Sequence, residues 1–427
     1  MTDEGTAVSF LTGTGPAPRF ADPHRLLAAS AALLVLCSHG LSPAVAQDAA
    51  GGVSLTFGLN LRAETDSNAD LDPVSAGGTS RATAGLSFAL ASETRSARLA
   101  LDAGMTLQAE SAPVGTDNGV TNPYVVLSFD RDAANAAFTL DASLRQTDLT
   151  TDREITDFDA ETGTRRTARI DTGLRWGEAR PLGFGLTAGI TDTRYQDAPG
   201  EADSTAARVG LTARLDLSEV SRLALGLRAS RFDEDGAPRA RDTLGFDAGL
   251  SIDRARGSLG LNYAIDDTED GQRQSLTFRH NLDLVRGTLA YSLGASRGVT
   301  GEIRPVVSLD YSLALPRSSL TLGLDRSVTA DSEDAETVVT SASLDYRQDL
   351  GPRSRISLSL NWATSETTAT NLTTTNTNLG ATYSHDLTED WALDAGYRHR
   401  LRDEDGAGEG RSDSVFLGLR RDFSVLR

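Results

Sequence analysis

The sequence has no lysine and only one cysteine, Cys37, among its 427 residues. All 41 basic residues are therefore arginine, and 60 acidic residues outnumber them to give a formal net charge of −19. This acidic excess argues against a nucleic-acid-binding protein, which carries a basic stripe. Because Cys37 lies in the N-terminal leader described below, we expect no disulfide and no thiol chemistry in the mature chain.

Beyond the leader, the chain lacks any run of about 18 consecutive apolar residues, the length that a membrane-spanning helix requires. This absence excludes a helical membrane protein. It does not exclude a membrane β-barrel, because only every second residue of a barrel strand faces lipid.

The N-terminal region has the layout of a secretory signal peptide. His24 and Arg25 precede a short apolar core over 26–36, and the small-residue site Ala44-Val45-Ala46 follows before Gln47. Charged start, apolar core and small-residue site together predict export and cleavage after Ala46. We therefore expect a leader over 1–46 and a mature domain over 47–427. A membrane-anchoring helix is the alternative, although the apolar core is short for a span.

Strict alternation of apolar residues dominates the mature chain. Over 182–190, 209–217 and 223–227, apolar residues occupy every second position. A period of two places them on one face of a β-strand, whereas a helix would distribute them around its whole surface. The other face carries Gly, Thr, Ser, Arg and Asp. Long alternation of this kind is typical of a membrane β-barrel with lipid outside and water inside.

The same pattern recurs in about twenty segments of ~9–13 residues, with eighteen strands as the alternative count. Long acidic connections alternate with short ones, as expected for extracellular loops and periplasmic turns. We therefore predict an all-β, transmembrane, antiparallel up-and-down barrel; a secreted solenoid or sandwich is the alternative. The long connections are 63–80, 109–122, 146–166, 191–204, 232–242, 326–336 and 402–413. The short ones are 92–96, 130–135, 177–181, 218–221, 253–257, 285–287, 315–318 and 386–390.

All three tryptophans lie at the ends of predicted strands. Trp176, Trp362 and Trp391 are placed there as the aromatic girdle of a membrane barrel requires, since indole rings favour the lipid–water interface.

The end of the chain resembles the C-terminal assembly signal of bacterial outer-membrane porin-like β-barrels. In 415–423, the apolar residues Val415, Leu417 and Leu419 alternate and lead to the aromatic Phe423. Four residues follow Phe423, whereas members of that family usually end at the aromatic residue. The segment 64–71 also resembles the start of uncharacterised outer-membrane barrels classed with the porins. This resemblance implies insertion by the barrel-assembly machinery.

Charged residues that alternate with the apolar ones are expected to line the lumen. One interpretation is that they form cross-strand ion pairs that stiffen the wall; the other is that they set up a transverse field that sorts polar solutes. The predicted pore-lining residues are Arg98, Asp102, Asp141, Arg145, Arg169, Asp171, Arg175, Arg208, Arg214, Arg222, Arg228, Arg279, Arg347 and Arg398.

The third long connection, 146–166, is rich in carboxylates. In porins the third outer loop folds inward as a constriction, so the resemblance implies that role here. The alternative is an acidic surface loop that binds divalent ions beside lipopolysaccharide. The residues concerned are Asp148, Asp152, Glu154, Asp157, Asp159 and Glu161.

Signals for catalysis are poor. The mature histidines His280, His385 and His399 do not share metal-ligand spacing. Ser384, His385 and Asp386 are consecutive in a predicted strand, so their side chains point to alternating faces and do not form a triad. We expect no enzyme activity, no metal and no cofactor.

The sequence therefore predicts an outer-membrane barrel that acts as a porin-like passive channel for small polar solutes. Two rivals stay open: an export conduit for a charged polysaccharide, and a structural or adhesive barrel without a through-channel. The expected partners are outer-membrane lipid, lipopolysaccharide, the assembly machinery and polar solutes, with no nucleic acid. The sequence does not decide the oligomeric state.

Overall fold

A computed structural model describes residues 52–113, 115–149, 155–156, 158, 162–330, 336–367 and 372–426. The predicted leader over 1–46 lies outside these residues. In the described ranges no helix is long and apolar enough to cross a membrane. The regular elements there are β1 (Gly52–Asp66), β2 (Thr79–Glu93), β3 (Ala97–Ala112), β4 (Gly115–Ala133), β5 (Ala136–Asp148), β6 (Thr164–Trp176), β7 (Leu182–Gln196), β8 (Ser204–Asp216), β9 (Ser221–Glu234), β10 (Arg241–Arg254), β11 (Gly257–Thr268), β12 (Gly271–Leu284), β13 (Gly287–Arg297), β14 (Ile303–Leu315), β15 (Ser318–Ala330), β16 (Glu336–Gly351), β17 (Ser354–Thr367), β18 (Leu372–Asp386), β19 (Trp391–Glu404) and β20 (Gly408–Leu426).

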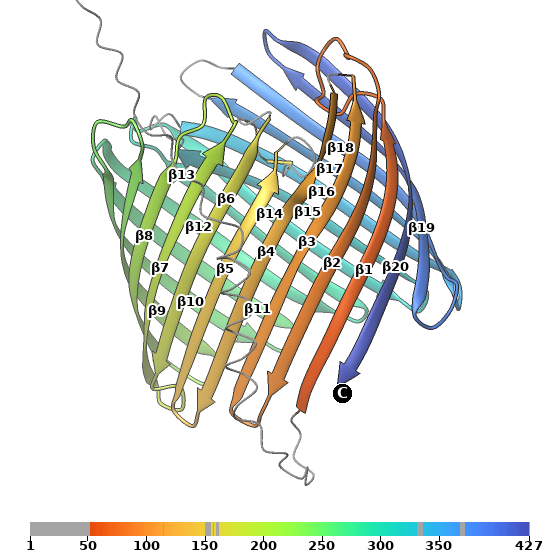
Figure 1. The fold of residues 1–427 in the computed structure, drawn as a ribbon. Coiled ribbons are helices and arrows are strands. Elements are labelled where there is room, and N and C mark those ends of the chain that lie inside the picture. Colours follow the sequence, from red (N-terminus) through yellow and green to blue (C-terminus); the bar gives the residue numbers. More distant parts are fainter. Residues whose placement is uncertain are drawn as a thin grey trace, which may run out of the picture. The chain divides into compact units, whose positions relative to one another are not determined.

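Each strand pairs antiparallel with the next strand along the chain, and β20 pairs back onto β1 (Figure 1). The β1–β20 pairing runs from Leu55 opposite Leu426 to Asp66 opposite Ser414. The wall is therefore a closed 20-stranded antiparallel β-barrel with no free edge. The predicted all-β, up-and-down fold and the count of twenty strands are confirmed.

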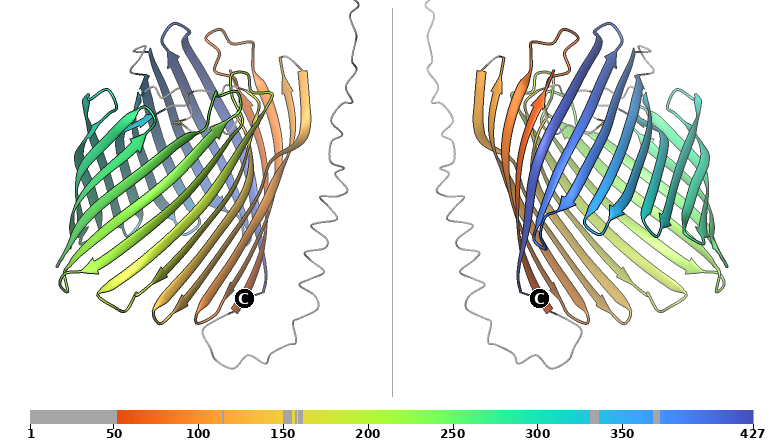
Figure 2. Two further views of the ribbon diagram at one scale, coloured as in Figure 1. Left: turned by 90° about the vertical axis from the view of Figure 1, so that its left-hand side faces the viewer. Right: turned by 90° about the vertical axis from the view of Figure 1, so that its right-hand side faces the viewer.

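The strands are longer than the alternation of apolar residues suggests. They range from 11 residues in β13 to 19 in β4, and the ladder continues through segments that the sequence assigned to loops. The prediction of a long loop over 109–122 is wrong, because β3 and β4 stay paired as far as Ala112 and Gly115. Backbone pairing does not require apolar side chains, so a polar hairpin cannot be distinguished from a loop by hydrophobic pattern. Figure 2 shows the resulting uneven rim, on which the β19–β20 hairpin and the neighbouring β1–β2 connection rise above the other strand ends.

We call the end of the barrel with the short connections the turn end and the opposite end the loop end. At the turn end, β14 and β15 are joined by residues 316–317 and β16 and β17 by residues 352–353. At the loop end, β1 and β2 are joined by 67–78, and β5 and β6 by 149–163. The described start and end of the barrel, Gly52 and Leu426, both lie at the turn end, as an even strand count requires.

The described part of the barrel has no dry apolar core. Its buried apolar side chains larger than alanine are Leu149 and Val338. In contrast, Leu211, Leu227 and Leu261 in the middle of the wall are 45%, 53% and 48% exposed. A soluble sandwich of this size would bury such residues between its sheets. The apolar stripe instead faces away from the chain, which is the arrangement that a lipid environment stabilises.

Two of the three tryptophans end their strands and the third does not. Trp176 is the last residue of β6 and Trp391 the first of β19, both at the turn end. Trp362 lies five residues before the end of β17, so its predicted position at a strand end is wrong. The ladder extends above Trp362 through Thr364 and Glu366, which lie on the same face. Because their side chains are polar, the apolar pattern ends before the strand does. The girdle role of the three rings stays a prediction.

The C-terminal strand carries its predicted apolar row on one face. Val415 and Leu417 are more than half exposed, and Phe423 lies opposite Phe57 of β1. The guanidinium of Arg421 lies over the rings of Trp391 and Phe423, 5.1 and 4.1 Å from their centroids. Whether this row, with Leu419, acts as an assembly signal stays a prediction.

The partition of the two faces makes a direct prediction for Leu261 and its neighbour Asn262 in β11. We expect Leu261→Arg to lower the free energy of unfolding in lipid by about 2–4 kcal/mol, the cost of a cation near the centre of a bilayer. Asn262→Arg on the opposite face should change it little. Urea titration of both variants in lipid vesicles provides the measurement, and equal losses would contradict the assigned faces.

Candidate functional site

Two hydrogen bonds that cross the barrel identify the inner face of its wall. Asn376 of β18 donates through Nδ2 to the carbonyl oxygen of Ile155 (3.0 Å), and Arg402 of β19 donates through Nη2 to that of Phe158 (3.0 Å). Ile155 and Phe158 belong to the β5–β6 connection, and five strands separate β5 from β19 by the shorter way around the ring. Ile155 and Phe158 thus reach β18 and β19 from another side of the ring, which places their carbonyl groups inside the mouth. Asn376 and Arg402, each 6% exposed, therefore face inward.

The register then transfers this assignment to every other strand. Residues directly opposite each other share a face, and alternate residues of one strand share a face. Arg402 pairs with Asn376 and Gly410, for example, and this sequence of partners can be followed through all twenty strands. We call this the inner face. All fourteen predicted pore-lining residues lie on it: Arg98, Asp102, Asp141, Arg145, Arg169, Asp171, Arg175, Arg208, Arg214, Arg222, Arg228, Arg279, Arg347 and Arg398. Their role in permeation stays a prediction.

Arginines of the inner face are concentrated on β5–β9, which we call the arginine sector. Eight arginines of this face lie on these strands: Arg145, Arg165, Arg169, Arg175, Arg208, Arg214, Arg222 and Arg228. Four carboxylates share the face of the same strands: Asp141, Asp171, Asp216 and Glu234. The arginine sector therefore carries a net positive charge.

Asp171 is the centre of an ion triad within the arginine sector. Its two carboxylate oxygens pair with Arg169 on the same strand and with Arg208 two strands away. The pair with Arg208 passes over Gly189 of β7, where a Cβ would collide with Asp171 Oδ1 and lie 3.0 Å from Arg208 Nε. A glycine on the middle strand is thus what allows the bridge to span three strands. Arg169 and Arg208 remain about half exposed, so their guanidinium groups stay in contact with water.

The same arrangement recurs at Arg228. Its Nη2 lies 2.7 Å from Asp266 of β11, and the side chain reaches it across Gly245 of β10. Asp247 accepts a longer contact of 3.5 Å from Nη1. The predicted cross-strand ion pairs therefore exist in this part of the wall. Each is a small stabilising contribution because water screens it.

A carboxylate cluster lies on the opposite side of the ring. Asp310 of β14, Asp325 of β15 and Asp345 of β16 are exposed on the inner face, and β15 is ten strands from β5. Among the described residues, none of these three carboxylates forms an ion pair. Asp325 lies seven residues from the turn end of its strand at Ser318, and Arg169 lies seven from Trp176. We call the three the aspartate cluster; like Arg169, its members lie near the middle of their strands, on the opposite side of the ring.

A second polar cluster, which the sequence did not predict, lies where the barrel closes. Asp66 at the end of β1 is 7% exposed and accepts hydrogen bonds from Arg400 Nη2 (2.7 Å) and Ser412 Oγ. Asn68, 5% exposed, donates through its backbone N–H to Asp66 Oδ1 (2.9 Å). The signal in the sequence is the turn-forming run over 66–73, rich in Asp and Asn and ending in Pro.

The carboxyl of Asp70, in the connection after β1, has a raised pKa. Partial burial is the largest cause, followed by the charges of Asp72, Glu110 and Asp66, while Arg400 acts in the opposite direction. Acidic groups of the connection and of β3 therefore lie near one another at the loop end, with Arg400 beside the connection and Arg81 paired with Glu110.

Of the six predicted constriction carboxylates, the structure describes Asp148. Asp152, Glu154, Asp157, Asp159 and Glu161 lie outside the described residues. Asp148 is the last residue of β5 and pairs with Thr164, so it belongs to the ladder and not to the connection. The constriction role of all six stays a prediction, although the positions of Ile155 and Phe158 support an inward path.

The histidines form hydrogen bonds with neighbouring side chains. His280 contacts Tyr291 (3.0 Å), His385 contacts Ser354 (2.8 Å) and His399 contacts Asp413 (2.8 Å). Within the part of the chain that the structure describes, no three His, Cys, Asp or Glu side chains gather as a metal site.

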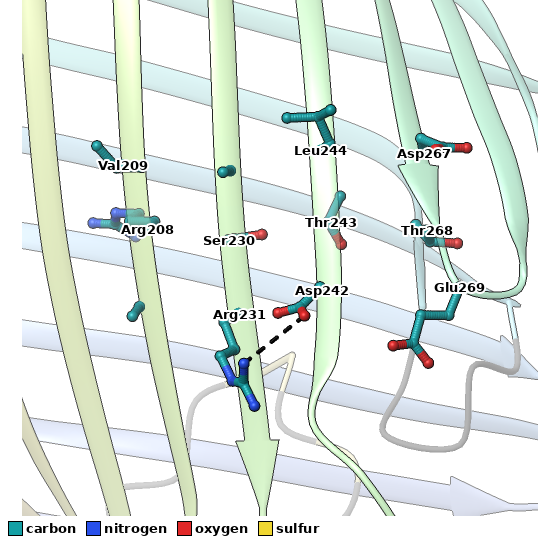
Figure 3. Close-up of a pocket in the computed structure, with 12 residues that line it drawn as sticks. Arg208, Val209, Ser230, Arg231, Asp242, Thr243, Leu244, Asp267, Thr268 and Glu269 are labelled. Carbon is teal, nitrogen blue, oxygen red and sulfur yellow. Dashed lines mark ion pairs between the residues drawn. The ribbon is translucent and has the colours of Figure 1, made fainter.

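A depression of about 680 Å³ lies in the wall between β8 and the end of β11 (Figure 3). Arg231 and Asp242, 3.9 Å apart, face each other at its rim. Both residues alternate with inner-face neighbours, Ser230 and Thr243, so their side chains belong to the outer face. The depression is therefore a groove on the outside of the barrel and not part of its lumen.

No family model and no curated protein matches the sequence. Solved structures with a similar fold include the siderophore receptor PirA from Pseudomonas aeruginosa, at 12% identity over 86% of this chain and 80% of that one, with a TM-score of 0.49. OccK7 (OpdD) from Pseudomonas aeruginosa is 13% identical over 88% of this chain and 100% of that one, with a TM-score of 0.44. These are outer-membrane β-barrel proteins.

The ion pair between Asp171 and Arg208, which passes over Gly189, predicts a small loss of stability when a side chain is added at that glycine. Gly189→Ala should displace Asp171 from Arg208 and lower the free energy of unfolding by about 0.2–1 kcal/mol, the usual range for a solvated pair. Gly260→Ala is the matched control, because its Cβ would meet only ordinary contacts at 3.8 Å or more on the same face. Urea unfolding in detergent measures both, and a loss in the control as large as in Gly189→Ala would contradict the bridge.

The raised pKa of Asp70 predicts that replacing its carboxyl group stabilises the protein in a pH-dependent way. The folded state binds the Asp70 proton more tightly than the unfolded state, so this contribution to stability is complete below the unfolded pKa and is lost as pH rises through the folded pKa. Asp70→Asn should therefore raise the urea midpoint at neutral pH and leave it unchanged in acid. A shift of equal size at both pH values would show that the charge of Asp70 is not the cause.

Proposed function

We propose that this protein is an outer-membrane β-barrel that acts as a porin-like passive channel for small polar solutes. The observation that carries the proposal is the contrast between the two faces of its wall: apolar side chains face outward, and charged and hydroxyl side chains face inward. Such a wall separates lipid from water.

The size of the ring supports a water-filled lumen. Side chains of about eight strands fill the interior of a small barrel, whereas barrels of 16 or more strands leave an aqueous channel or hold a plug. A ring of twenty strands is of the second kind. Its inner face also contains hydroxyl and amide groups that bind water, among them Ser343, Asn361 and Asn378 on β16–β18.

The charges of the wall support sorting of solutes by dipole and charge. The arginine sector and the aspartate cluster face each other across the ring, so their fields add in the space between them. The exposed guanidinium groups of Arg169 and Arg208 and the carboxylates of Asp310, Asp325 and Asp345 lie near the middle of their strands. A solute with separated positive and negative groups would align across this field.

A structural barrel without a through-channel is the second candidate. The observation that favours it is the pair of connections anchored inside the mouth, one through Ile155 and Phe158 and one through Asn68. Segments in these positions narrow the entrance. Conductance distinguishes the two candidates directly.

Single-channel recording in planar bilayers tests the channel. We expect stepwise, ohmic currents from the folded barrel, with an ion selectivity that depends on the facing charges. Arg169→Gln with Arg208→Gln should shift the reversal potential in a salt gradient toward cations, and Asp310→Asn with Asp325→Asn should shift it toward anions.

Arg231→Gln is the matched control, because Arg231 lies on the outer face and should leave the reversal potential unchanged. Unchanged potentials in both inner-face variants would contradict the lumen assignment. Silence of a barrel that is folded, as shown by its resistance to denaturation on a gel without heating, would favour the structural candidate.

A further inference from the structure

We propose that the β1–β2 connection, residues 67–78, is a fixed constriction of the channel entrance, latched to the inner face across the seam where β20 closes onto β1. The constriction rests on the proposed channel function, whereas the latch itself does not. We use the name seam latch for the contacts that Asp66, Asn68, Arg400, Gly410 and Ser412 make with this connection.

The polar half of the seam latch is centred on Asp66. This carboxylate receives Arg400 from β19 and Ser412 from β20 as well as the backbone N–H of Asn68, so three segments meet on one nearly buried group. Hydrogen bonds to a charged group are worth more than neutral ones, and breaking a buried pair leaves its partner unsatisfied. The carboxylate therefore fixes the direction in which the chain leaves β1.

Backbone anchors then hold the connection down. Asn68 donates through Nδ2 to the carbonyl oxygens of Asp72 (2.8 Å) and Arg411 (3.0 Å). Arg400 Nη2 also donates to the carbonyl oxygen of Ala69 (3.1 Å). Asn68 and Ala69 are 5% and 8% exposed, unusually low values for a connection at the rim of a barrel. The first turn of the connection is thus part of the folded wall.

Gly410 shows that the connection lies against the inner face. Gly410 pairs with Arg402, and the side chain of Arg402 reaches Phe158 inside the mouth. Paired residues share a face, so a Cβ added to Gly410 would point inward. A Cβ there would overlap the carbonyl oxygen of Leu71, far inside van der Waals distance. Leu71 has a φ of 60°, a conformation that a non-glycine residue adopts only when its surroundings impose it.

The latched connection also approaches the β3–β4 hairpin at the rim of the barrel. A Cβ on Gly77 would lie 3.0 Å from the ring of Pro113, at the tip of the β3–β4 hairpin. After partial burial and the charge of Asp72, the charge of Glu110 on β3 raises the pKa of Asp70, so Asp70 lies near β3. The connection therefore runs along the entrance over β20, β1 and β3. Leu71 lies at Gly410 and Phe158 at Arg402, and these two positions are paired with each other.

Two consequences follow for a solute that enters the barrel. The seam latch reduces the cross-section at the loop end, which sets an upper size for passage. It also places Asp70 and Asp72, both exposed, at the entrance, where carboxylates attract cations and repel anions. Residues 67–78 are therefore a size-determining element separate from the charges near the middle of the strands.

Cysteine accessibility tests the latch without reference to transport. In a Cys37→Ser background the chain has no native cysteine, so Ala69→Cys supplies a single thiol at a buried position of the connection. We expect slow reaction with a water-soluble maleimide, and a rate several-fold higher once Gly410→Ala displaces Leu71. Gly418→Ala is the matched control on the same strand and face, since its Cβ would come no closer than 3.4 Å to any atom.

Bilayer recording then tests the constriction. Gly410→Ala should raise the single-channel conductance and admit larger polyethylene glycols than the unmodified barrel, whereas Gly418→Ala should not. Arg400→Ala provides a second release of the connection by a different route, for use if Gly410→Ala does not fold. Folding of each variant is confirmed by its resistance to denaturation without heating.

The outcomes separate the latch from the channel. Labelling that is equally fast in the unmodified, Gly410→Ala and Arg400→Ala barrels would overturn the latch, whatever the conductance. A released connection with unchanged conductance and unchanged polymer cut-off would overturn the constriction. Silence of the unmodified barrel with conduction after release would support the constriction as a complete plug and contradict the passive channel.

Discussion

Closure of the backbone ladder between β20 and β1 is the constraint on which the rest of the structure depends. A strand in lipid cannot leave N–H and C=O groups unpaired, because no water is present to satisfy them. Twenty strands that pair in sequence order solve this problem only when the last meets the first, over the stretch from Leu55 to Asp66. Once the ring is closed, every strand has one face toward the outside and one toward the lumen. The alternation of apolar and polar residues then acquires its physical meaning.

Glycine has a specific use on the inner face of this ring. Arg208 and Arg228 each reach a carboxylate two strands away, and in both cases the intervening strand carries a glycine, Gly189 or Gly245. The same principle holds at Gly410, where the missing side chain admits a backbone carbonyl. Arg208 and Arg228 thus lie along the wall instead of extending into the lumen. An inner surface built in this way is stiff and leaves room for water.

The periodicity of side chains allowed the fold and the inner-face residues to be predicted from sequence. Because the period of a strand is two, assigning Leu211 to lipid also assigns Thr212 and Gly210 to the other face. The ends of strands could not be predicted in this way, as 109–122 and Trp362 show, because the ladder continues after the apolar pattern stops. The seam latch was not predicted either. Asp66 is far in the sequence from Arg400 and Ser412, which pair in the β19–β20 hairpin, and their meeting depends on the register between the first and last strands.

The amino-acid sequence by itself determined that this chain forms strands and which side chains share a face, whereas it left eighteen strands open beside twenty. These properties depend on local geometry, since alternation along one strand is independent of its neighbours. Only the tertiary structure decided which charges meet, because pairing depends on register and on the order of strands around the ring. It also decided that Asn68, Ala69 and Leu71 contact β19 and β20, and that the backbone of Ile155 and Phe158 contacts β18 and β19, since these contacts join segments that are distant in the sequence.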